Sequence, residues 1–282
     1  MIEREPIGRF RFHQKEQHER EPRHDALVEW TWTSARSRSP AYSTAMARRY
    51  FASPLPPAGL ATLSPGLGHH LGRVVRTKPG DAVVLFDGAG AEVHATIVAV
   101  QGRDVLVEVG APVARLLGRS PRLALDVACA LPKSPRTDWL FEHGTEVGIR
   151  SFRPIVTERT NRQHERHKAW QRILIAACAQ SDRLVLPTIE PTVSLDELCA
   201  MPLPESRFVA TLAEAELGPA VADTALLVVG PEGGLTEREI SQLMAAGFAP
   251  RSLGPLTLRT ETAVLAGATR LLQRPMDRRP GC

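Results

Sequence analysis

Hydrophobic residues in the C-terminal half of the chain form short apolar runs that alternate with segments of helical spacing. Apolar runs predict buried strands, and apolar residues recurring every three or four positions predict amphipathic helices. The predicted strands are residues 123–129, 152–156, 208–212 and 225–229. The predicted helices are residues 137–147, 165–180 and 195–201, with another after Thr236. This alternation predicts an α/β fold with a parallel sheet and helices on both faces.

A different pattern precedes this region. Runs rich in β-branched residues are separated by Gly-containing turns, which predicts an antiparallel meander. These runs are residues 82–86, 92–100 and 104–109. Short strands of this kind favour a small β-barrel. Apolar residues at Leu71, Val74 and Val75 predict a short helix that starts near His69, before the barrel strands.

Shifts in composition divide the chain into three regions. Residues 1–45 are rich in Arg, Glu, His and Ser and lack an apolar period, so we expect a disordered extension or a segment upstream of the true start. Residues 111–121 carry two prolines and a glycine, which is typical of a linker. We therefore expect a β-barrel domain at 46–115 and an α/β domain at 120–276.

The overall composition narrows the protein class. A chain of 282 residues with 43% hydrophobic residues can bury sizeable cores. The formal charge of +4 permits a polyanionic partner without demonstrating one. The four cysteines have no Cys-x-x-Cys spacing, which favours reduced thiols and a cytoplasmic location. No apolar stretch approaches the roughly 18 residues that span a bilayer, so no membrane-spanning segment is expected. The histidines are not accompanied by cysteines or carboxylates that could complete a metal site, so no metal is expected.

The most informative segment follows the last predicted strand. Gly230, Gly233 and Gly234 lie within five residues, so backbone amides there can approach a ligand without obstruction by Cβ atoms. Thr236 and Glu239 have the spacing of a capping box, which starts a helix. Strand, Gly-rich loop and helix N-terminus therefore follow one another, as in the binding sites of open α/β sheets.

A second ligand-type loop lies close by in sequence. The short apolar segment 252–258 ends at Arg259, and Thr260 is the predicted N-cap of the last helix. Ligands of open α/β sheets bind beyond the carboxyl ends of the strands. Leu212 and Leu253 are therefore expected at the same edge as the Gly-rich loop.

The Gly-rich loop lacks the features of a phosphate site. It has neither the lysine of Gly-x-x-x-x-Gly-Lys-[Ser/Thr] nor the spacing of Gly-x-Gly-x-x-Gly, and Glu232 would repel a phosphate. For Glu232 itself, capping or backbone bonding within the loop is favoured over chemistry. A neutral or cationic ligand, bound by backbone groups and an apolar wall, fits this loop better than a phosphate does. S-adenosylmethionine is such a ligand, although composition alone does not name it.

Two segments resemble the signature motifs of the RsmE family, the 16S ribosomal RNA (uracil-N3)-methyltransferases of the SPOUT superfamily. These are Gly-Pro-Glu-Gly-Gly-Leu-Thr-Glu-Arg-Glu-Ile at 230–240 and Leu-Gly-Pro-Leu-Thr-Leu-Arg-Thr-Glu-Thr-Ala at 253–263. The resemblance extends over nearly the whole chain from Met46. Its other matching segments include residues 48–51, 70–76, 145–149 and 176–183.

The resemblance implies a PUA-like N-terminal β-barrel that holds RNA, followed by a SPOUT domain with a parallel sheet and a trefoil knot. It also implies S-adenosylmethionine as cofactor, 16S rRNA of the small ribosomal subunit as substrate, and a homodimer in which two subunits complete each active site. Two alternatives stay open at this point. One is a non-catalytic RNA-binding or ribosome-assembly factor, and the other is a methyltransferase with a different RNA target.

The resemblance also assigns residues. The implied cofactor residues are Leu212, Gly230, Gly233, Gly234, Leu253, Gly254 and Leu258. Arg259 is the candidate for stabilising charge on the uracil carbonyls, with Glu261 as base or as the group that orients the arginine. The two could instead form an ion pair at the helix terminus. Candidate RNA-binding cations, which could equally be solvated surface charges, are Arg48, Arg49, Arg73, Arg76, Lys133 and Arg136.

Three positions depart from the family pattern. Leu256 stands where the second motif usually has an arginine, Ala179 where a glutamate is common, and His143 where a lysine is frequent. All three replace a charged group. Together they leave room for altered RNA specificity or reduced activity.

Overall fold

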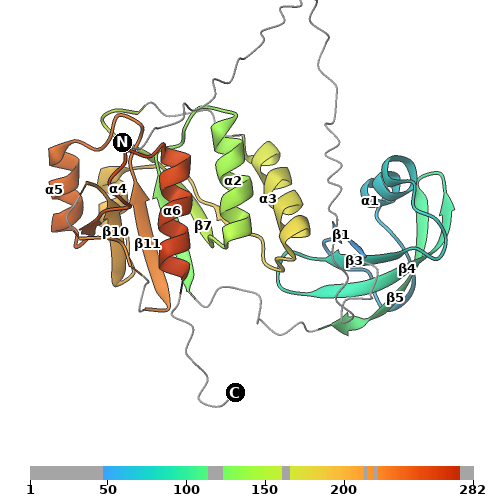
Figure 1. Cartoon of the computed structure of the whole chain (residues 1–282). Coiled ribbons are helices and arrows are strands. Elements are labelled where there is room, and N and C mark those ends of the chain that lie inside the picture. The colour runs from blue at the N-terminus through green and yellow to red at the C-terminus, as the bar shows by residue number, and fades with distance from the viewer. Residues whose placement is uncertain (1–46, 114–122, 161–165, 213–214, 219–221, 274–282) are drawn as a thin grey trace, which may run out of the picture. The chain divides into compact units, whose positions relative to one another are not determined.

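The computed structural model describes residues 47–113, 123–160, 166–212, 215–218 and 222–273 (Figure 1). The expected disordered extension and most of the predicted linker lie outside the described residues, as does the expected end of the α/β domain at residue 276. The trefoil knot and the domain boundaries stay predictions.

The N-terminal part is a five-stranded mixed sheet in the order β1-β3-β4-β5-β2. Its strands are β1 (Arg48–Phe51), β2 (Gly59–Thr62), β3 (Ala82–Phe86), β4 (Glu92–Gln101) and β5 (Asp104–Val113). The predicted antiparallel meander of β3, β4 and β5 is confirmed. The sequence did not predict β1, which pairs parallel with β3, or β2, which pairs antiparallel with β5.

Two boundaries in this part differ from the prediction. Strand β5 continues to Val113, into the segment predicted as linker, because it stays paired with β4 beyond residue 109. The helical segment before β3 begins at Pro65, as α1 (Pro65–His69), and continues as the π-helix η1 (His70–Val75). Leu71 of η1 is fully buried in the core of this sheet.

The C-terminal part contains the predicted parallel sheet, in the order β12-β10-β11-β6-β7-β8 with β9 paired to β7. Its strands are β6 (Ala124–Cys129), β7 (Ser151–Val156), β8 (Thr188–Ile189), β9 (Val193–Ser194), β10 (Ser206–Ala210), β11 (Thr224–Val229) and β12 (Ala249–Arg251). Strand β10 begins and ends two residues earlier than predicted, so Leu212 lies in the loop after it.

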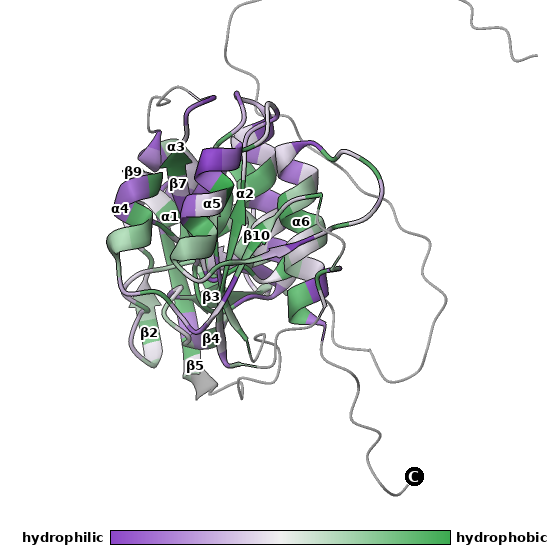
Figure 2. Cartoon of the chain, turned by 90° about the vertical axis from the view of Figure 1, so that its left-hand side faces the viewer, coloured by the Kyte–Doolittle hydropathy of each residue, from purple (hydrophilic) through white to green (hydrophobic). Residues whose placement is uncertain are grey.

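Helices cover both faces of this sheet, as predicted (Figure 1). They are α2 (Arg136–Val147), α3 (His167–Ser181), α4 (Leu195–Ala200), α5 (Glu237–Ala245) and α6 (Thr260–Leu272). Leu227 of β11 packs in one core with α2, α3 and α6, whereas its neighbour Leu226 packs in another with α4 and α5. Alternate residues of a strand point to opposite faces, so β11 is apolar from Ala225 to Val229, and the strands of this sheet are largely hydrophobic (Figure 2).

The two helices beside the candidate loops begin differently. Helix α5 has the predicted capping box, in which the Thr236 hydroxyl accepts from the Glu239 amide at 3.2 Å and the Glu239 carboxylate accepts from the Thr236 amide at 2.8 Å. The prediction that Thr260 caps α6 is wrong. Arg259 is the N-cap residue without a side-chain capping bond, and the Thr260 hydroxyl bonds elsewhere.

Within the described residues, no helix is both long enough and apolar enough to cross a bilayer.

Candidate functional site

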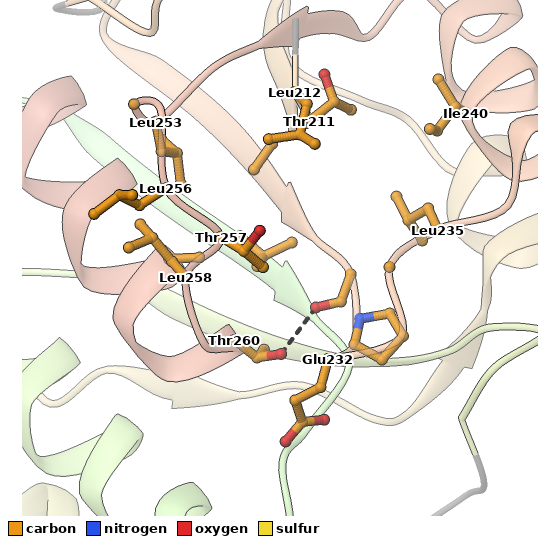
Figure 3. A pocket seen from close by; sticks show the side chains of 17 residues that line it. Thr211, Leu212, Glu232, Leu235, Ile240, Leu253, Leu256, Thr257, Leu258 and Thr260 are labelled. Carbon is orange, nitrogen blue, oxygen red and sulfur yellow. Dashed lines mark hydrogen bonds between the residues drawn. The ribbon is translucent and has the colours of Figure 1, made fainter.

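A cavity of about 340 Å³ lies beyond the carboxyl ends of β10 and β11 (Figure 3). This volume is in the range of about 300–1,000 Å³ typical of small-molecule sites. Its walls come from the loop after β10, the Gly-rich loop after β11, the loop at residues 253–258, and the first residues of α5 and α6. Parallel strands bring these loops to one edge of the sheet, as expected for an open α/β fold.

The Gly-rich loop is a tight turn in which glycine is needed at defined points. A Cβ atom on Gly230 would lie 2.8 Å from Cγ of Leu235, which is itself a wall of the cavity. Gly234 has a φ of +71°, a conformation that L-residues rarely adopt, and its amide donates to the Pro231 carbonyl at 2.8 Å. These glycines are therefore needed to keep the shape of the turn that forms this wall of the cavity.

The second loop also presents backbone groups. The Ser252 hydroxyl accepts from the Gly254 amide at 3.1 Å and fixes the turn, in which Gly254 has a φ of +132°. Within the described part of the chain, no hydrogen bond uses the amides of Leu256, Thr257 or Leu258. These three residues line the cavity, and we expect their amides to be available to a ligand there.

The remaining wall is mainly apolar, and two of its leucines are strongly exposed. Leu212 is 80% exposed and Leu256 is 74% exposed, although both line the cavity. Leu256 thus places an apolar side chain at the rim. Large exposed apolar side chains at a rim are typical of surfaces that meet a ligand or a partner.

Six of the seven residues implied as cofactor ligands line this cavity, namely Leu212, Gly230, Gly234, Leu253, Gly254 and Leu258. Gly233 does not line it, and its carbonyl accepts from the Arg159 guanidinium instead. Sequence reasoning missed several lining residues, among them Thr211, Leu235, Ile240, Thr257, Thr260 and Ala263. All but Thr211 belong to the motif segments 230–240 and 253–263, and Thr211 is adjacent to the predicted Leu212, so membership of these segments was the available signal.

Arg259 and Glu261 are close in sequence to the cavity but do not line it. The Arg259 side chain is exposed, and Glu261 is buried in the first turn of α6. The ion pair that the structure gives Glu261 is with Arg136, at 3.9 Å, and Arg136 also pairs with Glu232 at 2.6 Å. The alternative of an Arg259–Glu261 pair therefore does not describe this geometry, and Glu232 pairs with a side chain outside its own loop.

The candidate RNA-binding cations fall into two groups. Four are exposed, namely Arg48, Arg73, Arg76 and Lys133. Arg49 differs from these four, because its side chain is only 6% exposed and pairs with Glu92 at 3.2 Å and Asp182 at 3.4 Å. Its guanidinium also lies 4.8 Å from the ring centroid of Phe86. This arginine is a buried structural cation in the geometry observed, and Arg136 is engaged by its two carboxylates.

Two residues outside the cavity have local packing roles. His143 stacks on Trp139, with ring centroids 4.2 Å apart, and its Nδ1 bonds the Trp139 carbonyl oxygen at 2.9 Å. Cys178 is buried, as expected for a core thiol, and burial raises its pKa to about 11. A thiol of this kind is protonated at neutral pH and therefore a poor nucleophile.

Comparison with known proteins identifies two families of domain in the chain. Residues 119–272 match a model described as an RNA methyltransferase domain, and residues 65–110 match an RNA methyltransferase PUA domain. Among solved structures, the ribosomal RNA small subunit methyltransferase E from Neisseria gonorrhoeae bound to S-adenosyl methionine is 29% identical, with a TM-score of 0.72, over 79% of this chain and 95% of that one. A methyltransferase from Legionella pneumophila with the cofactor bound gives 28% identity and a TM-score of 0.71, over 80% of this chain and 96% of that one.

Curated relatives point the same way. Ribosomal RNA small subunit methyltransferase E from Synechocystis is 32% identical over 72% of this chain and 69% of the relative. The protein of the same name from Mycobacterium tuberculosis is 31% identical over 82% of this chain and 94% of the relative. The methyltransferase domain model covers more than half of this chain, and both of these relatives are more than 30% identical to it. This chain belongs to the ribosomal RNA small subunit methyltransferase E family.

Proposed function

We propose that the protein transfers a methyl group from S-adenosylmethionine to N3 of a uridine in 16S rRNA of the small ribosomal subunit. The observation that carries this proposal is the cavity at the strand ends, formed by the two loops that bear the family's signature motifs. Two similar solved structures are described as bound to S-adenosylmethionine. We infer a cytoplasmic location, where such a substrate resides.

The cavity suits this cofactor on chemical grounds. Its leucines offer an apolar surface to a flat base, and the amides at 256–258 offer donors to the edge of that base. The Gly-rich loop lacks the lysine of a phosphate-binding loop. We infer that Gly230, Leu253 and Leu258 contact the cofactor.

The reaction needs alignment and removal of one proton. Bound S-adenosylmethionine supplies an activated methyl group, so the N3–CH₃ bond forms as the S–CH₃ bond breaks. The protein must hold N3 in line with that bond and accept the proton that N3 loses. We propose Glu261 as the proton acceptor and Arg259 as the cation that stabilises charge on the uracil carbonyl oxygens. Both would contact the RNA base, and we place that base beside the cofactor cavity because neither residue lines the cavity.

Two measurements test the proposal. Calorimetric titration of the purified protein with S-adenosylmethionine should give saturable binding, and the absence of heat would refute the enzyme reading in favour of a non-catalytic RNA-binding factor. Nucleoside mass spectrometry of 16S rRNA from cells lacking the gene should show loss of N3-methyluridine. Unchanged modification there would refute the assigned substrate and leave a different RNA target.

Arg259→Ala is expected to lower kcat about tenfold while the melting temperature changes little. Loss of a preorganised charge-stabilising donor costs about 2.7–4 kcal/mol, and we expect about half of that, about 1.4 kcal/mol or tenfold in rate, for an exposed side chain. The side chain makes no capping bond, so the fold does not depend on it. Full activity in this variant would remove Arg259 from the chemistry.

We also propose a homodimer. The cavity rim carries two exposed leucines, Leu212 and Leu256, that a second copy would cover. Sedimentation equilibrium is expected to give twice the monomer mass at micromolar concentration. A monomer that retains full activity would contradict this proposal.

A further inference from the structure

Three charged side chains from separate parts of the sequence meet beside the cavity. Arg136 is the first residue of α2, Glu232 belongs to the Gly-rich loop, and Glu261 lies in the first turn of α6. Nη1 of Arg136 lies 2.6 Å from Oε1 of Glu232 and 3.9 Å from Oε2 of Glu261. One guanidinium therefore stands between two carboxylates.

The two carboxylates of this cluster differ in burial. The Glu261 side chain is only 7% exposed, and its Oε2 forms no hydrogen bond within the described residues. A buried carboxylate is costly unless a cation compensates it. The buried Glu261 carboxylate is therefore stabilised by a cation beside it, and Arg136 supplies that cation. Arg136 and Glu232, with side chains 36% and 44% exposed, form the outer half of the cluster.

Glu232 connects this cluster to the cofactor cavity. It lines the cavity, but its carboxylate points away from the leucines of the wall (Figure 3). The same turn is also bonded at Gly230, whose carbonyl accepts from the Thr260 hydroxyl at 3.1 Å. The first turn of α6 therefore holds the Gly-rich loop at two points, directly through Thr260 and indirectly through Glu261 and Arg136.

We propose that Arg136 is a positioning residue for methyl transfer, which fastens the Gly-rich loop to α6 by bridging Glu232 and Glu261. This role replaces the RNA contact expected for Arg136 from the sequence. In this proposal Glu232 anchors the Gly-rich loop, whose glycines would otherwise allow it several backbone conformations. The proposal rests on the proposed function, since the loop is taken to form part of the S-adenosylmethionine site.

The test compares S-adenosylmethionine binding by calorimetry in wild type, Arg136→Ala, Glu232→Gln and the double variant. Arg136→Ala is expected to raise Kd about three- to fivefold, the range for loss of a partly exposed ion pair. Glu232→Gln should raise it by a similar factor. The double variant should bind no more weakly than Arg136→Ala alone, because both changes break the same link. Arg136→Lys, which keeps the charge, should stay within about twofold of wild type.

Arg270→Ala is the matched control. Arg270, with a side chain 33% exposed against 36% for Arg136, pairs with Glu216 near the opposite end of α6, at 3.7 Å, and this pair is outside the cavity. Its removal should leave Kd unchanged. Melting temperatures of all variants show whether each one folds, and Glu232→Gln tests the link without altering α2 if Arg136→Ala does not fold.

The outcomes separate the two proposals. If wild type does not bind S-adenosylmethionine, the proposed function fails. If wild type binds and Arg136→Ala binds equally well, the bridge is not a positioning device. If the effects of Arg136→Ala and Glu232→Gln multiply in the double variant, the two residues act independently and the proposal is likewise overturned.

Discussion

Replacement of Glu261 by glutamine is expected to lower kcat for methylation of 16S rRNA about 100-fold at saturating cofactor. Glutamine keeps the size of the side chain but cannot accept the proton that N3 loses, and positioned proton transfer contributes typically about 10²–10⁴-fold. The Kd for S-adenosylmethionine should change by only a few fold, because Glu261 does not line the cofactor cavity. Single-turnover methylation with tritiated cofactor measures the chemical step directly.

Glu237→Gln provides the control for this experiment. Glu237 is an exposed acidic residue in the first turn of α5, so its replacement removes a comparable favourable interaction with a helix N-terminus, worth about 0.3–1 kcal/mol. We expect unchanged turnover in that variant. If Glu261→Gln lowers the melting temperature but retains turnover, Glu261 serves only to pair with Arg136, and the proton acceptor must be sought elsewhere.

The local sequence pattern was sufficient to predict the central strands and the loops that follow them. The apolar runs of β6 and β11 are buried on both faces, so they read as strands without reference to the rest of the chain. Gly230 and Gly234 predict a tight turn by residue type alone, and the spacing of Thr236 and Glu239 predicts the capping box of α5. Parallel pairing then brings Leu253 to the same edge.

Contacts between segments that are far apart in the sequence could not be predicted from that pattern. Strand β1 is only four residues long and is identified by its parallel pairing with β3, a partner about 35 positions away. Arg49 reads as a surface cation in sequence, yet Glu92 and Asp182 surround it in the fold. Thr260 has the composition of an N-cap, but the acceptor it finds is the Gly230 carbonyl, which competes with capping. Each error arises where a tertiary partner overrides a local preference.

Gly234→Val is expected to weaken S-adenosylmethionine binding at least tenfold, because this position holds the turn of the Gly-rich loop in shape. Its φ of +71° is strained for any L-residue, by roughly 1–2 kcal/mol, and more so for a β-branched one. The loop can relieve that strain by rotating the peptide, which moves the turn whose amide bonds the Pro231 carbonyl. One wall of the cavity would then be displaced, and each 1.4 kcal/mol of lost binding is a tenfold change in Kd.

Gly80→Val separates this effect from general strain. Gly80 has a φ of +93° in the turn before β3, and a Cβ atom there would meet nothing within 4 Å, so the substitution imposes similar backbone strain outside the cavity. It should lower the melting temperature about as much as Gly234→Val while leaving Kd unchanged. Because both variants strain a left-handed glycine, a loss of binding confined to Gly234→Val can be attributed to the loop itself. Normal affinity in Gly234→Val would show that the Gly-rich loop is not part of the cofactor site.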